Sequence, residues 1–176
     1  VILSMLRILD NPLQDIPMAA VLASPIVGMD DEELAQIRSA FKGVSFAQAV
    51  LSAMAGENGY EDEKLKAFAL VFERLRGAVA DTPIHELLYM MLDETGFYRY
   101  ASAMPAGKRR RQNIDMLIEM AAAYEKTSYK GLFHFVRYID IQQKYEIDYG
   151  EADTAGENDD VVRIMTIHKS KGLEFP

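Results

Sequence analysis

The sequence predicts a mainly α-helical protein with one strand near its carboxyl end. Apolar residues recur at three- and four-residue spacing over most of residues 2–146, which is the period of an amphipathic helix. Residues that favour helix N-caps, such as Asp30 and Ser45, stand where these patterns begin. Residues 161–167 differ, because they are rich in β-branched side chains and have no helical period, so they predict a strand.

The first half of the chain predicts four helices. Residues 2–10 are too apolar for an exposed helix, so we expect them to pack on a large apolar surface before a proline ends the pattern. Residues 17–23 predict a short helix with a proline at its first position. Asp30 and Glu33 have the spacing of a capping box, and Ser45 is the expected N-cap of the fourth helix.

The second half predicts four longer helices, each with an apolar stripe along one face. They cover residues 60–80, 82–96, 108–128 and 132–146, and Gly96 ends the second of them. The helical part of the chain is therefore expected to hold seven or eight helices.

The composition changes after residue 146. Residues 147–160 contain six acidic residues and two glycines but few apolar side chains, which is typical of a solvated linker. A single strand is not stable without a sheet, so the sheet of residues 161–167 is expected to belong to another domain. We therefore divide the chain into a helical domain (1–146), an acidic linker (147–160) and an incomplete α/β segment (161–176), and we expect it to be a piece of a longer protein.

The composition also limits the function. The 176 residues carry 19 Lys and Arg against 27 Asp and Glu, a net charge of −8, so any contact with nucleic acid is expected to be local. The absence of cysteine excludes disulfides, thiolate metal sites and a cysteine nucleophile. No apolar run approaches the length of a membrane span, and the three histidines lack metal-ligand spacing, so we expect no membrane and no metal site.

The most informative segment is residues 161–176, VVRIMTIHKSKGLEFP. A buried strand here runs into a polar turn in which Thr166, His168 and Lys171 offer hydrogen bonds to phosphate oxygens. Gly172 allows a tight turn or a close approach of the backbone to a ligand. The segment is not a P-loop, because GxxxxGK[ST] occurs nowhere in the chain. On these residues alone, a solvated lysine-rich turn remains the alternative.

The run MTIHKSKGLEF within this segment resembles motif V of superfamily 1 helicases, the UvrD, PcrA, RecB and AddA group. Its HKSK form is similar to the RecB and AddA branch. Residues 6–38, with NPLQDIP and SPIVG, resemble the AddA family segment that follows motif IV. Residues 111–114 and 131–139 are also similar, so the resemblance spans nearly the whole chain.

The resemblance implies that the helical domain is subdomain 2B, inserted into the second RecA-like domain of an ATP-dependent helicase–nuclease. Such an enzyme uses ATP and Mg²⁺, pairs with an AddB-like protein, and resects broken DNA ends in the bacterial cytoplasm. It also implies that Thr166 and His168 contact the backbone of single-stranded DNA and that Gly172 and Glu174 reach the nucleotide. The other motor and nuclease motifs of the family lie outside these residues, so we expect the chain alone to be inactive.

A second candidate site is the basic run at residues 108–111. Four cations at a helix start oppose the helix dipole, which invites a functional interpretation. We hypothesise that Lys108, Arg109 and Arg110 contact duplex phosphates. The alternative is a solvated turn in which Arg111 pairs with an acid.

Two other functions stay open. A RecB-like protein or a stand-alone UvrD-type helicase would keep the superfamily but change the branch. A non-catalytic helical module that docks a partner protein would be a function of another class, and the net charge of −8 slightly favours it.

Overall fold

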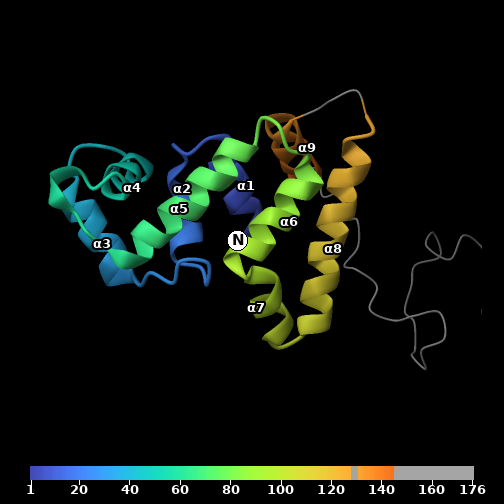
Figure 1. The fold of residues 1–176 in the computed structure, drawn as a ribbon, viewed down its shortest axis with the longest axis horizontal. Coiled ribbons are helices and arrows are strands. Elements are labelled where there is room, and N and C mark those ends of the chain that lie inside the picture. The colour runs from blue at the N-terminus through green and yellow to red at the C-terminus, as the bar shows by residue number, and fades with distance from the viewer. Residues whose placement is uncertain (128–130, 145–176) are drawn as a thin grey trace, which may run out of the picture.

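The structure is a computed structural model that describes residues 1–127 and 131–144. Within these residues the fold is entirely helical, which confirms the predicted mainly-α class. Figure 1 shows α3 and α4 at one end, α6, α7 and α8 at the other, and α5 running between them. The elements are α1 (Ile2–Asp10), α2 (Asp15–Leu22), α3 (Asp31–Ala40), α4 (Phe46–Met54), the 3₁₀ turn η1 (Glu57–Gly59), α5 (Glu63–Ala78), α6 (Ile84–Thr95), α7 (Phe97–Ala103), α8 (Gly107–Tyr124) and α9 (Leu132–Lys144).

Helix α1 lies at the centre of the fold, as its excess of apolar residues predicts. It contacts α2, α5 and α9, and its side chains Met5, Leu6, Ile8 and Leu9 are buried. These residues belong to a continuous hydrophobic core that also takes buried side chains from every other α-helix. Burial of a large aliphatic side chain stabilises a fold by about 1.5–3 kcal/mol, so α1 is a major contributor.

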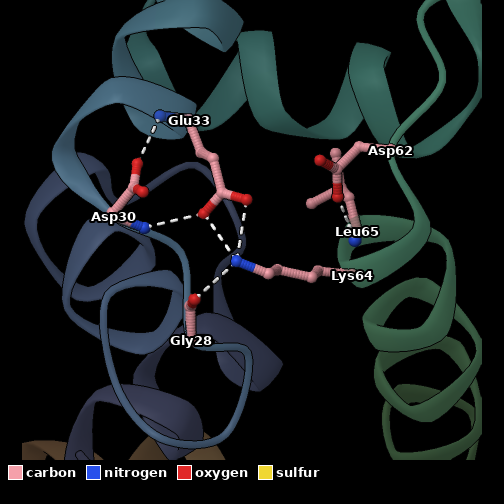
Figure 2. Close-up of polar contacts among 6 residues, drawn as sticks. All are labelled: Gly28, Asp30, Glu33, Asp62, Lys64 and Leu65. Carbon is pink, nitrogen blue, oxygen red and sulfur yellow. Dashed lines mark hydrogen bonds and ion pairs between the residues drawn. The ribbon is translucent and has the colours of Figure 1, made fainter.

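Side-chain caps fix the starts of several helices. The Asp30 carboxylate accepts a hydrogen bond from the Glu33 N–H (2.8 Å), and the Glu33 carboxylate accepts one from the Asp30 N–H (2.8 Å), which confirms the capping box (Figure 2). The Ser45 hydroxyl caps α4 in the predicted way by accepting from the Gln48 N–H at 3.2 Å. Asp62 caps α5, a cap that the sequence analysis missed.

The structure differs from the predicted elements in two places. Helix α7 was not predicted, because only Gly96 separates it from α6 and it is seven residues long. The glycine adopts a left-handed φ of 64°, which ends α6 as expected and lets α7 begin at once. Helix α2 begins at Asp15, so the proline predicted at its first position is instead its third residue.

Two features hold the far parts of the chain together. The Arg7 guanidinium in α1 donates to the Asp140 carboxylate in α9 at 2.6 Å and to the Gln143 side chain at 3.2 Å. Helix α8 contacts both α6 and α7, so the start of α8 and the α7 helix form one end of the molecule (Figure 1). The predicted linker and strand, residues 147–176, lie outside the described residues.

Candidate nucleic-acid interface

The basic run lies in the first turns of α8. Lys108, Arg109, Arg110 and Arg111 are all exposed, and the first turn contains no acidic residue. The helix dipole places partial positive charge at the same end. The start of α8 is therefore a concentrated patch of positive potential on a protein whose net charge is −8.

The turn before α8 leaves backbone donors uncovered. Ala106 occupies the N-cap position with a left-handed φ of 57°, and no side chain of the described residues caps the helix. The first backbone hydrogen bond of α8 runs from the Arg110 N–H to the Ala106 carbonyl (3.1 Å). The N–H groups at the start of a helix otherwise bind water, caps or anions.

Gly107 is required at this turn. A Cβ atom on Gly107 would lie 2.0 Å from the carbonyl oxygen of Ser102 in α7. The backbones of α7 and α8 therefore approach more closely than any other residue would allow. This contact fixes the direction in which α8 leaves the turn, and with it the position of the basic run.

The cations of the run do not share one face of the helix. Successive residues of an α-helix point about 100° apart, so Lys108, Arg109 and Arg110 fan around the axis. Arg110 turns back, and its Nε donates to the Pro105 carbonyl at 3.1 Å. Arg111 lies on the side of Tyr98, where its charge lowers the pKa of the Tyr98 phenol. An anion would therefore meet these cations at the end of the helix rather than along its side.

An open pocket of about 420 Å³ lies beside the run, between α6, α7 and α8. Its lining includes two tyrosines, two aspartates and one arginine: Tyr89, Tyr98, Asp93, Asp115 and Arg99. The Tyr98 hydroxyl lies 3.1 Å from Oδ1 of Asp115, to which it donates. Burial, followed by this hydrogen bond, raises the pKa of Tyr98 above its usual value, despite the opposing effect of Arg111.

Sequence reasoning missed this pocket because it missed α7, which supplies Tyr98 and Arg99. The available signal was Gly96, since a glycine that ends one helix can be followed directly by another. Sequence reasoning also missed the partner of His85, which lies with its Nδ1 2.5 Å from Oε2 of Glu125. His85 therefore takes part in a contact between α6 and the end of α8. In the part of the chain that the structure describes, no three side chains are grouped as metal ligands.

The predicted motif residues Thr166, His168, Gly172 and Glu174 lie outside the described residues, so their roles stay predictions. The described helices also bear on membranes, since none of them is long and apolar enough to span a bilayer.

Comparison with known proteins identifies relatives along the whole chain. The family model described as UvrD-like helicase C-terminal domain matches residues 1–176. Over its full length the chain is 45% identical to the AddA protein of Anoxybacillus flavithermus, an ATP-dependent helicase/nuclease, and covers 15% of that protein. It is 45% identical to the protein of the same name from Bacillus cytotoxicus and 43% identical to that from Bacillus mycoides, covering 14% of each. The chain thus spans only about one seventh of these relatives.

Proposed function

The chain belongs to the UvrD-like helicase C-terminal domain family, and we propose that it is the accessory helical part of an ATP-dependent DNA helicase–nuclease of the AddA type. The observation that carries this proposal is the 43–45% identity, over the full chain, to AddA relatives named as ATP-dependent helicase/nucleases. The helical fold of residues 1–127 and 131–144 agrees with an accessory domain rather than with a motor core. This assignment favours the AddA branch over a RecB-like or stand-alone UvrD-type helicase.

The helical part, assigned to residues 1–146, is proposed to orient duplex DNA ahead of the motor. Lys108, Arg109 and Arg110 would contact duplex phosphates. Support comes from their exposure at the start of α8, from the helix dipole, and from backbone N–H groups that no described side chain caps. Because inserted domains commonly move as units, the domain would also swivel relative to the motor.

The segment after the acidic linker at 147–160 is proposed to couple DNA to the nucleotide. Thr166 and His168 would contact the backbone of single-stranded DNA, and Gly172 and Glu174 would reach the ribose of ATP. Phosphoryl transfer also needs the phosphate-binding lysine, acidic magnesium ligands and an arginine around the phosphates. The 176 residues contain no GxxxxGK[ST] pattern, so ATP and Mg²⁺ would be bound by the parent protein and not by this chain alone.

The proposed setting is the bacterial cytoplasm, where the parent would pair with an AddB-like protein and resect duplex ends before recombinational repair. Support comes from the printed activity of the relatives, which joins a helicase to a nuclease in one polypeptide. Resection of a DNA end needs both activities, one to separate the strands and one to cut them.

The test compares the 176-residue chain with the full-length polypeptide that its gene encodes. The full-length protein should hydrolyse ATP in the presence of single-stranded DNA, whereas the chain alone should show no turnover above a buffer control after repurification. In the full-length protein, His168→Ala should weaken single-stranded DNA binding, and Glu174→Gln should raise the KM for ATP. A full-length protein without DNA-stimulated ATP hydrolysis would contradict the proposal.

A second candidate is a non-catalytic module that docks a partner protein, and the net charge of −8 favours it. A binding assay separates the two functions. Binding to tailed duplex DNA at low salt supports the first, whereas binding to the isolated partner protein without any binding to DNA supports the second.

A further inference from the structure

The pocket between α6, α7 and α8, the three helices at one end of the molecule in Figure 1, combines aromatic rings with charges of both signs. Tyr89 exposes 58% of its surface, although it lies beside the helical core. Among the described residues, nothing forms a hydrogen bond or an ion pair with the side chain of Asp93 or of Arg99. The pocket therefore presents an aromatic surface together with a free hydrogen-bond acceptor and a free donor.

The balance of charge indicates which class of ligand fits. A basic side chain from a protein would meet Arg99 in the pocket and Arg111 beside Tyr98. A bare phosphate would meet the carboxylates of Asp93 and Asp115. A nucleobase is flat and neutral, so it stacks on tyrosine rings without either repulsion. Its amino groups can donate to a carboxylate, as cytosine and adenine do in base recognition.

The pocket is also continuous with the basic run of α8. Arg111 is one helical turn before Asp115, and its charge acts on the Tyr98 phenol at the pocket wall. A nucleotide whose base lay against Tyr89 and Tyr98 would therefore have its phosphate directed towards a cationic helix start. A protein that stacks single-stranded bases combines aromatic rings with a positively charged track in the same way.

We propose that this pocket binds an unpaired nucleobase of a DNA strand whose phosphates lie at the start of α8. The proposal rests on the DNA-binding role proposed above and deepens it, because it assigns the domain a preference for duplex ends that carry an unpaired tail. A free nucleotide offers the same base and phosphate, so the experiment must separate these two sources.

The probe is a duplex with a short single-stranded tail that contains 2-aminopurine, whose fluorescence falls when the base stacks. With the 176-residue chain at low salt, we expect saturable quenching and about five- to tenfold tighter binding of tailed than of blunt duplex, at the lower end of what one stacked base contributes. Tyr89→Ala should remove both effects and leave the affinity for blunt duplex unchanged. Tyr100→Ala is the matched control, because Tyr100 is 43% exposed and lies outside the pocket.

The outcomes distinguish this pocket from the function on which it rests. If quenching and tail preference survive in a folded Tyr89→Ala protein, the pocket is overturned while duplex binding stands. If the wild-type chain binds neither duplex, the DNA-binding role itself fails and the pocket fails with it. Displacement of the tail by micromolar adenosine monophosphate would overturn the DNA assignment in favour of a free nucleotide.

Discussion

The ammonium group of Lys64 lies 2.7 Å from both carboxylate oxygens of Glu33 and 2.9 Å from the Gly28 carbonyl (Figure 2). Glu33 also closes the capping box of α3, so one carboxylate both starts a helix and joins it to α5. The hydrogen bond to Lys64, followed by that from the Asp30 N–H, holds the pKa of Glu33 below its usual value. The same hydrogen bond raises the pKa of Lys64.

Glu33→Gln should lower the stability of the fold at neutral pH. The amide can still accept from the Asp30 N–H, but it loses the charge that pairs with Lys64. Because the pKa of Glu33 is lowered in the folded protein, its contribution is present above the unfolded value of about 4.5 and is lost as the pH falls through the folded value. Urea denaturation at several pH values should show the difference between the two proteins shrinking below about pH 4.5.

The control for this experiment is Glu73→Gln, which removes an exposed charge from α5. It should leave the denaturation midpoint nearly unchanged at every pH. A Glu33→Gln effect that persisted unchanged in acid would contradict the role assigned to the Glu33 charge.

Glu125→Ala should destabilise the junction of α6 and α8. The Glu125 carboxylate accepts from the Ile84 N–H at the start of α6 and contacts the His85 ring, so it acts as a cap supplied from a distant helix. Loss of a helix cap costs about 1 kcal/mol in the free energy of unfolding. Glu125→Gln, which keeps an acceptor for Ile84, should cost less. Lys126→Ala at the neighbouring exposed position is the control, and equal losses from Glu125→Ala and Lys126→Ala would refute the cap.

Gly107→Ala and Gly77→Ala should change stability in opposite directions. At Gly107 the added methyl would meet the Ser102 carbonyl, and such overpacking costs about 1–3 kcal/mol. Gly77 lies in α5 with open space around it, so alanine there should stabilise the helix by about 0.5–1 kcal/mol. Thermal denaturation followed by circular dichroism measures both. A neutral Gly107→Ala would mean that α7 and α8 do not approach as closely as described.

Charge reversal at the start of α8 should weaken binding to duplex DNA. For Arg109→Glu and Arg110→Glu, measured singly, the slope of log affinity against log salt should become flatter by about one unit per lost phosphate contact. Arg76→Glu, an exposed position on α5, is the control for the change in net charge. Fluorescence anisotropy over a range of salt concentrations gives the slopes, and slopes equal to that of Arg76→Glu would argue against the contacts.

The sequence predicted local features of the fold well and distant contacts poorly. The capping box at Asp30, the cap at Ser45 and the end of α6 at Gly96 follow from the properties of single residues, and the structure confirms all three. The contact between Arg7 and Asp140 joins residues 133 positions apart, and no local pattern encodes it. Prediction of such a contact needs the three-dimensional path of the whole chain.

The candidate site divides along the same line. The exposure of Arg109 and Arg110 at a helix start could be predicted, because four adjacent cations cannot be buried together. The fan of these side chains and the neighbouring pocket could not, because both depend on the close approach at Gly107 and on α7. The roles of the residues in the 161–176 segment stay predictions.

The packing of α1 against α9 has a consequence for synthesis of the protein. A ribosome makes α1 first, yet the apolar side chains of this helix are covered in part by a helix that is made more than 120 residues later. Synthesis at about 5–20 residues per second leaves that surface waiting for several seconds. During this interval the emerging chain presents Leu6 and Leu9 without their full cover, which makes it a substrate for chaperones that bind nascent apolar segments.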